Sequence, residues 1–231
     1  IIAGDGVEAL QLVRSHVPDI IVSDVMMPRM NGYKLCKTIK EDINISHIPV
    51  ILLTARDDRQ SQISGYKNGA DGYLSKPFEV EMLMELIRNR LKNREYTKKR
   101  YLNAGLIPTP EESTISLTDE TFLIKLNSII QENIENSNLG IQFICQEVGL
   151  GRSSLYNKLK ALTGMGANEY ISKLRIEKAI TLISGTDMPF SEIAEKTGFT
   201  TPSYFSTAFK QYTGETPSQY KERKKKGLAG K

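Results

Sequence analysis

The sequence has few of the residues that build disulfide frameworks and metal centres: two cysteines and two histidines among 231 residues. Cys36 and Cys145 lie far apart, and each falls within a helical pattern. We expect both to be reduced, buried thiols that belong to neither a disulfide nor a metal site. His16 and His47 have no cysteine or carboxylate at ligand spacing, so we expect them at the surface or in packing contacts.

Long apolar runs are also missing. No run approaches the ~20 residues that a membrane span needs, and no signal peptide is visible. The composition, with 39% hydrophobic and 25% charged residues, is typical of a soluble globular protein. We therefore expect a cytoplasmic protein with one large or two ordinary domains.

Charge is spread unevenly along the chain. Residues 1–95 hold 13 basic and 13 acidic side chains, whereas residues 141–231 hold 14 basic and 8 acidic ones. The excess of positive charge in the second half indicates nucleic acid as its partner. The basic run at 221–226 has a second interpretation, a solvated helix end.

The first half alternates short β-branched apolar runs with amphipathic stretches. This alternation favours a doubly wound parallel sheet. We expect strands at 19–24, 49–54 and 71–76 and helices at 6–16, 31–42, 57–68 and 79–92.

Three polar side chains end these strands: Asp24, Thr54 and Lys76. Parallel strands align their carboxyl ends, so a carboxylate, a hydroxyl and an ammonium meet at one edge of the sheet. The trio suits a phosphoryl group on Asp24, because the hydroxyl can donate to it and the ammonium can compensate its charge. A divalent cation would neutralise the carboxylate and the donor phosphate together, and oxygen ligands favour Mg²⁺. Asp24 alone could equally cap the next helix.

Residues 1–95 resemble a response-regulator receiver domain, which implies a flavodoxin-like fold. The resemblance rests on Asp24 with Met27-Pro28 and Asn31-Gly32, on Thr54-Ala55, on 69–73 and on Lys76-Pro77.

The resemblance also implies roles for individual residues. Asp24 would be the phospho-acceptor, and Asp24 and the Met26 carbonyl would be metal ligands. Thr54 and Lys76 would bind the phosphoryl group, and Tyr73 would be the aromatic switch that turns inward on activation.

One departure concerns the metal. Receivers carry an acidic pair at the end of their first strand, whereas residues 1–3 here look like the second strand. The first strand, its acidic pair and the first helix are missing, so we expect an incomplete receiver and a fragment that begins inside a longer chain. Asp5 and Glu8 belong to a turn and a helix start. We expect Mg²⁺ in an intact receiver and not in this fragment.

Residues 96–118 have the composition of a linker. A helix at 119–135 follows, with Thr118 as its cap. Its inner face would consist of Phe122, Leu126, Ile129 and Ile130.

The rest of the second half nearly repeats itself. Residues 143–164 and 193–214 each read as a short helix, a glycine turn and a second helix, with a long helix at 167–184 between them. This is the helix-turn-helix signature. Two such units in one chain can enter successive major grooves of DNA. The alternative is a helical bundle with a solvated face.

The second helix of each unit offers polar side chains that suit phosphate and base contacts. Leu155, Leu159, Tyr204, Phe205 and Phe209 would instead be packing residues. The expected DNA-binding residues are Arg152, Ser153, Asn157, Lys158, Thr201, Ser203, Thr207 and Lys210.

Residues 115–224 resemble an AraC-type DNA-binding domain, most clearly in Ile193-Ala194, Gly198-Phe199 and the run at 214–220. We expect a receiver at 1–95, a linker at 96–118 and a DNA-binding domain at 119–226 that is all-α with two helix-turn-helix motifs.

This order of domains predicts a two-component response regulator. Phosphorylation of Asp24 by a histidine kinase would control sequence-specific binding to double-stranded DNA, and thereby transcription, with a homodimer as the active form. The kinase could be a separate protein or part of the same chain, as in hybrid regulators anchored in the inner membrane. Two alternatives are a pseudo-receiver that serves as a dimerisation scaffold and a phosphotransfer enzyme or phosphatase.

Overall fold

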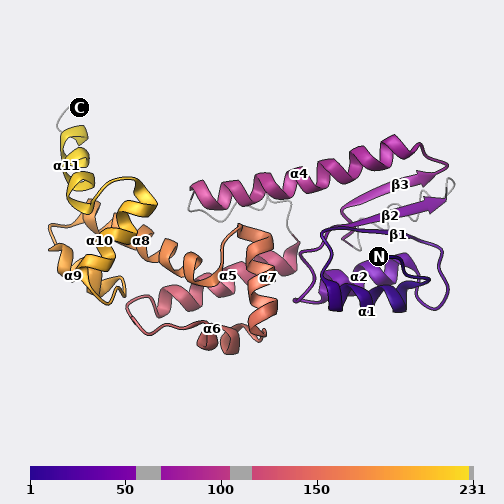
Figure 1. Cartoon of the computed structure of the whole chain (residues 1–231), viewed down its shortest axis with the longest axis horizontal. Helices are drawn as coiled ribbons and strands as arrows, with labels where there is room; N and C mark the ends of the chain where they lie inside the picture. Colours follow the sequence, from indigo (N-terminus) through magenta and orange to yellow (C-terminus); the bar gives the residue numbers. More distant parts are fainter. Residues whose placement is uncertain (56–68, 105–115, 229–231) are drawn as a thin grey trace. The chain divides into compact units, whose positions relative to one another are not determined.

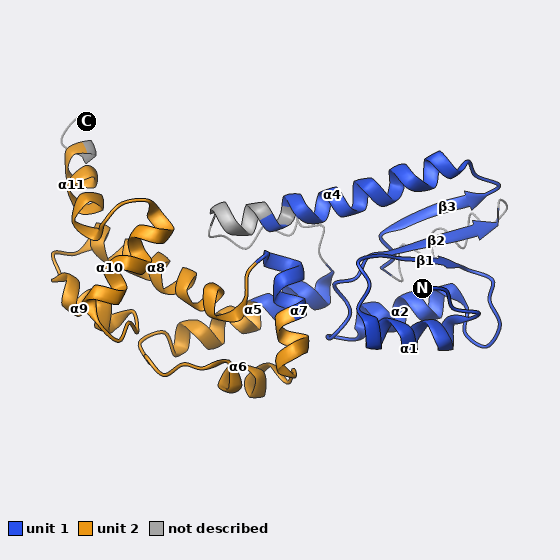
Figure 2. Cartoon of the chain, viewed as in Figure 1, with its two compact units in different colours: residues 1–123, 157–164 blue, residues 124–156, 165–231 orange. Residues whose placement is uncertain are grey.

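The computed structural model describes residues 1–55, 69–104 and 116–228. It divides into two compact units (Figure 2). Unit 1 comprises residues 1–123 and 157–164, and unit 2 comprises residues 124–156 and 165–231. The helix expected at 57–68 lies outside the described residues, and so do residues 105–115 of the expected linker.

Unit 1 contains a parallel sheet with the strand order β1-β2-β3. Its strands are β1 (Ile21–Asp24), β2 (Val50–Ala55) and β3 (Gly72–Lys76), which confirms the three predicted runs. Asp24 lies opposite Leu53, and Thr54 lies opposite Ser75. The three strands therefore end at the same edge of the sheet, as predicted.

Helices cover both faces of the sheet (Figure 1). The helices α1 (Gly6–His16) and α2 (Gly32–Glu41) lie on one face, and α4 (Val80–Ala104) lies on the other. Leu35 and Ile39 of α2 are completely buried against the sheet. Burial of each such side chain contributes roughly 1.5–3 kcal/mol.

Two features of unit 1 differ from the predictions. Residues 1–3 form no strand, and Val22 in the middle of β1 is 39% exposed rather than buried. Because residues 1–3 add no strand, β1 lies at an edge of the described sheet, where it pairs with β2 alone. The helix α4 also continues through the charged run at 94–100, so the predicted domain boundary at residue 95 falls inside a helix.

The helix α5 (Leu117–Glu132) begins earlier than predicted. The Ser116 hydroxyl accepts a hydrogen bond from the Asp119 amide at 3.2 Å, so Ser116 and not Thr118 caps the helix. Thr118 lies in the first turn, and its hydroxyl donates to the Lys40 carbonyl at 2.8 Å. The predicted inner face is confirmed: Phe122, Leu126, Ile129 and Ile130 are all buried.

The remaining helices comprise the two helix-turn-helix motifs and the helix that follows each of them. They are α6 (Ile141–Val148), α7 (Arg152–Thr163), α8 (Ala167–Gly185), α9 (Phe190–Lys196), α10 (Pro202–Thr213) and α11 (Pro217–Leu228). The first motif is α6–α7, followed by α8, and the second is α9–α10, followed by α11. The helix α7 begins in unit 2 and ends in unit 1.

Aromatic side chains form the core of the second motif. Phe199, Phe205, Phe209 and Tyr220 are buried, and successive rings lie 5.4, 5.7 and 5.6 Å apart between centroids. Such edge and tilted contacts add stability beyond that of area burial. Tyr204 is 56% exposed and meets Phe199 only at its edge, so its prediction as a packing residue is wrong.

The burial predicted for Cys36 and Cys145 is confirmed. Burial raises the pKa of the Cys36 thiol to about 12, which keeps it protonated and unreactive at neutral pH. Among the described helices, none is both long enough and apolar enough to cross a bilayer.

Candidate functional site

The carboxyl edge of the sheet brings together two of the three predicted strand-end residues. The Lys76 ammonium donates to Oδ2 of Asp24, although the residues belong to different outer strands of the sheet. The Met26 amide donates to the other carboxylate oxygen at 3.1 Å. Both oxygens of Asp24 are thus held in place at the protein surface.

These contacts keep the Asp24 carboxylate ionised. Burial raises the pKa of this carboxyl group. The hydrogen bond and charge of Lys76, together with the Met26 amide, lower it by a larger amount, so the pKa lies below its usual value. An ionised carboxylate oxygen is the form that can act as a nucleophile.

Thr54 ends the central strand between Asp24 and Lys76 but takes part in no contact with them. Its side chain is 1% exposed, and its hydroxyl has no hydrogen-bond partner among residues 1–55, 69–104 and 116–228. Burial of a hydroxyl without a hydrogen-bond partner is unfavourable. The Thr54 hydroxyl can therefore gain free energy by donating to a new acceptor. The hydroxyl of Tyr73 is also buried, and the ring packs against the core beneath the sheet.

The loop after β1 approaches the site closely. The Gly32 amide donates to the Val25 carbonyl at 3.0 Å. A Cβ atom at Gly32 would lie 2.3 Å from the Asp24 carbonyl oxygen, so only glycine fits there. Asn31 caps α2 by accepting from the Lys34 amide at 2.9 Å. The Asn31-Gly32 pair therefore sets the distance between α2 and the acidic strand end.

The described residues do not complete a magnesium site. Asp5 caps α1 and forms an ion pair with Arg29, which leaves it engaged in structural contacts. Within residues 1–55, 69–104 and 116–228, no three His, Cys, Asp or Glu side chains are placed to hold a metal ion. Asp24 and the Met26 carbonyl alone do not satisfy the six oxygen ligands that Mg²⁺ requires.

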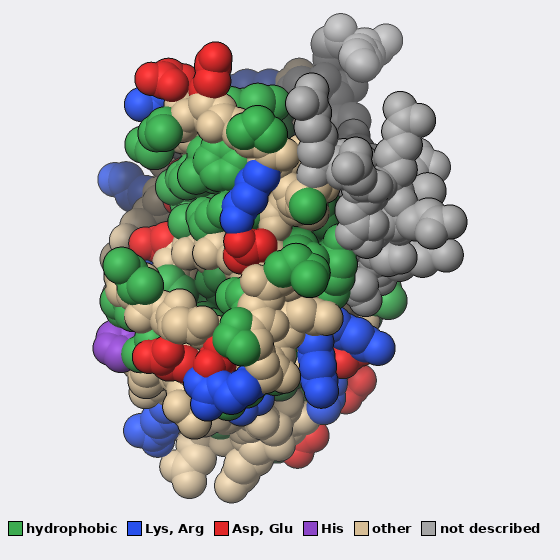
Figure 3. Space-filling model, turned by 90° about the vertical axis from the view of Figure 1, so that its right-hand side faces the viewer, with side chains coloured by type: hydrophobic (Ala, Val, Ile, Leu, Met, Phe, Trp, Pro, Cys, Tyr) green, Lys and Arg blue, Asp and Glu red, His purple; other side chains and the backbone are tan. Residues whose placement is uncertain are grey.

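The surface at this edge is mixed in character. Figure 3 looks onto the end of unit 1 where the strands finish, and hydrophobic side chains gather there beside acidic and basic ones. Met26, Val80 and Met82 are among the exposed hydrophobic residues of the unit. Such a surface suits contact with another protein.

Most of the predicted DNA-binding residues lie at the surface. The exposed ones are Arg152, Ser153, Asn157, Thr201, Ser203, Thr207 and Lys210. Thr201 also caps α10 by accepting from the Tyr204 amide at 3.1 Å, which starts the second helix of its motif. The Arg152 guanidinium donates to the Gln142 side chain at 3.4 Å.

Lys158 is the exception, and its prediction as an exposed residue is wrong. Its side chain is 0% exposed, and its ammonium forms an ion pair with Asp119. The side chain points inward because it lies three residues after Leu155 on the helix and so shares its buried face.

Two exposed tyrosines were missing from the predicted interface. Tyr156 of α7 is 54% exposed, and Tyr204 of α10 is 56% exposed. Each adjoins a buried anchor, Leu155 or Phe205, and a neighbour in a helix is rotated by about 100°. Alignment of the two motifs on these anchors would have placed both rings outside.

Comparison with known proteins identifies both halves of the chain. Residues 2–88 match the response regulator receiver domain, and residues 144–223 match a helix-turn-helix domain. The probable transcriptional regulator ycf29 of Pyropia yezoensis is 31% identical over 73% of this chain and 81% of its own length. The chain belongs to the response-regulator family.

The chain is also similar to part of a longer protein and to one solved domain. Histidine kinase P4 of Formosa agariphila is 42% identical over 96% of this chain, which spans 16% of that protein's length. The C-terminal domain of AraT, a response regulator from Geobacillus stearothermophilus, is 31% identical and covers 44% of this chain and 84% of its own, with a TM-score of 0.42. The predicted family, fold class and pairing of a receiver with an AraC-type DNA-binding domain are confirmed.

Proposed function

We propose that a histidine kinase phosphorylates Asp24 and thereby controls sequence-specific DNA binding by the two helix-turn-helix motifs. The observation that carries this proposal is the alignment of Asp24, Thr54 and Lys76 at one edge of a parallel sheet, with an ionised and partly exposed carboxylate. The helix-turn-helix motifs supply the output, control of transcription.

The proposed reaction transfers a phosphoryl group from a histidine nitrogen to a carboxylate oxygen of Asp24. A carboxylate oxygen of Asp24 attacks the phosphorus of a phosphohistidine, the P–N bond breaks, and the imidazole nitrogen leaves with its electron pair. Lys76 compensates the added negative charge from its existing position. The Thr54 hydroxyl, which has no other partner, then donates to a phosphoryl oxygen.

Magnesium enters this proposal only as an expectation. In an intact receiver, further carboxylates would join Asp24 and the Met26 carbonyl as ligands. The described residues do not supply them, so no step of the proposal is assigned to the metal here.

The DNA-reading surface would consist of the exposed side chains of α7 and α10. Arg152 and Asn157 can make bidentate contacts with guanine and adenine edges. Tyr156 and Tyr204 add exposed rings that can contact thymine methyl groups and sugars. Thr201, Ser203, Thr207 and Lys210, which are exposed, would contact phosphates.

The proposal is tested by treating the protein with phosphoramidate and measuring its intact mass. In a chain that also supplies the acidic pair of the metal site, one phosphoryl group should be added to the parent and none to the Asp24→Asn variant. The affinity for DNA fragments selected with the same protein should change on modification. Modification of Asp24→Asn, or an affinity that ignores the phosphoryl group, would overturn the proposal.

Dimerisation is the proposed link between input and output, because paired DNA sites favour a two-fold symmetric protein. Sedimentation of the unmodified and phosphorylated protein tests this link directly. The second candidate function is a pseudo-receiver scaffold. In that case Asp24→Ala should leave both DNA binding and its regulation untouched.

A further inference from the structure

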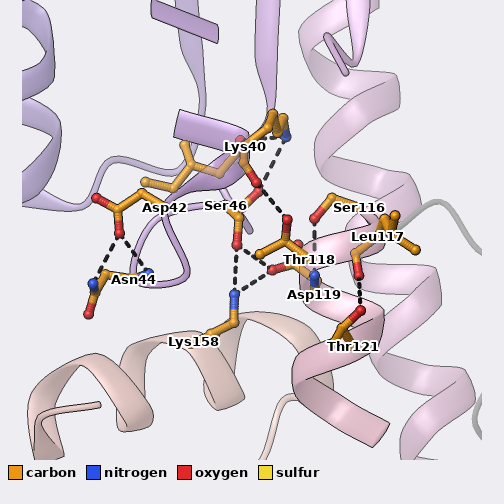
Figure 4. A network of polar contacts seen from close by, with 11 residues as sticks. Lys40, Asp42, Asn44, Ser46, Ser116, Leu117, Thr118, Asp119, Thr121 and Lys158 are labelled. Atoms are coloured by element: carbon orange, nitrogen blue, oxygen red, sulfur yellow. Dashed lines mark hydrogen bonds and ion pairs between the residues drawn. The ribbon is translucent and has the colours of Figure 1, made fainter. Parts of the chain in front are cut away.

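The most deeply buried charge described in unit 1 is the Lys158 ammonium near the end of α7. It forms an ion pair with Asp119 of α5 and donates to the Ser46 hydroxyl at 2.8 Å. The Ser46 hydroxyl in turn donates to the Asp119 carboxylate at 2.7 Å. Figure 4 shows the three side chains meeting from three different segments of the chain.

Ser46 belongs to the receiver, whereas its two partners belong to the helical domain. All three side chains are buried, with exposures of 0%, 2% and 0% for Ser46, Asp119 and Lys158. A buried ammonium is tolerated only when paired and hydrogen-bonded. The DNA-binding domain therefore relies on a receiver side chain to satisfy its own buried charge.

Lys40 fixes the receiver loop that presents Ser46. Its ammonium donates to the Ile48 carbonyl at 2.9 Å and pairs with Asp71 at 2.8 Å. Its own carbonyl accepts from Thr118 at 2.8 Å. One residue thus holds the loop at 45–48 in place and makes a second, independent bond to the start of α5.

The position of this loop in the sheet separates it from the phospho-acceptor. Residues 45–48 precede β2, and Asp71 precedes β3, so both lie at the amino edge of the sheet. Asp24 and Lys76 lie at the carboxyl edge. A contact at the amino edge leaves the carboxyl edge open to a kinase.

We propose that the receiver loop at 45–48 is a docking site for the DNA-binding domain. The docked loop would hold α7 in position for DNA reading and leave the exposed face of α7 uncovered. In the docked half of α7, Lys158, Leu159 and Ala161 are buried while Asn157 and Lys160 remain exposed. The face proposed to read DNA is therefore free. The docking rests on the contacts alone, and only its effect on DNA rests on the proposed function.

Hydrogen exchange of the full chain tests the docking without DNA or phosphate. Ser46→Ala removes the hydroxyl, and Ser46→Glu adds a like charge beside Asp119. Ser15→Ala is the matched control, because the hydrogen-bond partners of its hydroxyl, two carbonyls and the His16 ring, belong to its own helix. Amide exchange at 117–123 and 157–163 should rise at least about tenfold in both Ser46 variants, as expected for a lost hydrogen bond to a charged group.

Exchange in α10, which lies in unit 2, should stay unchanged and shows that each variant is folded. In the Lys158→Met/Asp119→Leu background, Ser46→Ala should no longer change exchange at 157–163. Unchanged exchange at 157–163 in both single Ser46 variants would overturn the docking. DNA titration then tests the effect of docking on DNA affinity. Ser46→Glu should weaken DNA binding. Tighter binding would contradict the proposed positioning of α7, since it would show that docking covers the DNA-reading face.

Discussion

Gly149 and Gly198 occupy the turns of the two helix-turn-helix motifs with the same backbone angle, φ of 72°, but in different surroundings. A Cβ atom at Gly149 would meet nothing within 4 Å. A Cβ atom at Gly198 would lie 2.2 Å from the Ile134 carbonyl oxygen and 2.8 Å from the Arg175 guanidinium. The two turns share a conformation and differ in packing.

The Gly149→Ala variant should therefore lose only about 1 kcal/mol of unfolding free energy, the cost of a left-handed alanine. The Gly198→Ala variant should lose about 3 kcal/mol or more, because backbone atoms must also move. Urea unfolding followed by circular dichroism measures both. Equal losses in the two variants would show that conformation alone, and not the close approach to Ile134, makes glycine necessary.

Removal of one partner of the buried Asp119–Lys158 pair should lower the unfolding free energy more than replacement of both partners by apolar residues. Lys158→Met leaves the Asp119 carboxylate buried, with the Ser46 and Ser116 hydroxyls as its remaining hydrogen-bond partners, so the unfolding free energy should fall by about 3–5 kcal/mol. Lys158→Met combined with Asp119→Leu removes both charges and should lose less than Lys158→Met alone. Denaturant titration of the two variants gives the comparison, and a double variant that is the less stable one would contradict it.

The pH dependence of unit 1 should include a contribution from His47. Burial and the charges of Lys158, Arg94 and Lys40, opposed by Asp119, lower the pKa of His47 to about 3. The unfolded chain binds a proton near pH 6.5, so between these values the unfolded state holds more protons. Stability is then complete above pH 6.5 and falls as the pH drops, by up to about 1.4 kcal/mol per pH unit.

The His47→Gln variant should lose this slope between pH 6.5 and 5. His16 is exposed on α1, so His16→Gln is the control. Thermal unfolding at a series of pH values makes the measurement. A parent protein that is equally stable at pH 7 and pH 5 would contradict the prediction.

The ionised state of Asp24 should depend on Lys76. In the Lys76→Met variant the pKa of Asp24 should rise, since the hydrogen bond and the charge that lower it are removed. Titration of the side-chain carboxyl by NMR measures the change. Lys37→Met, which breaks an exposed pair with Glu41 on α2, is the control, and an equal effect of both variants on Asp24 would argue against a specific contact.

Much of the fold follows from local patterns, because apolar runs and strand-end residues are features of adjacent positions. The strands around Asp24 and Thr54 and the anchors Leu155 and Phe205 were predictable in this way. The buried face of Lys158 follows from its position three residues after Leu155, but its ion-pair partner Asp119 lies 39 residues away, and no local pattern connects the two. The unsatisfied hydroxyl of Thr54 likewise depends on packing across the sheet.

Adjacent residues of α7 should separate DNA reading from stability. Asn157 is exposed and Lys158 is buried. If Asn157 contacts a base edge, Asn157→Ala should weaken binding to a selected DNA site by about 1–3 kcal/mol, or roughly 5- to 150-fold. Binding to unrelated DNA and the unfolding free energy should stay within about 0.5 kcal/mol of the parent.

Lys158→Met is the contrasting variant, because it removes stability and takes away no exposed group. Fluorescence anisotropy with the selected site and with unrelated DNA of the same length measures the preference for the site. An Asn157→Ala variant that keeps the full preference would remove Asn157 from the interface. A loss of affinity on both DNAs alike would instead assign Asn157 to the phosphate backbone, because phosphate contacts carry no sequence information.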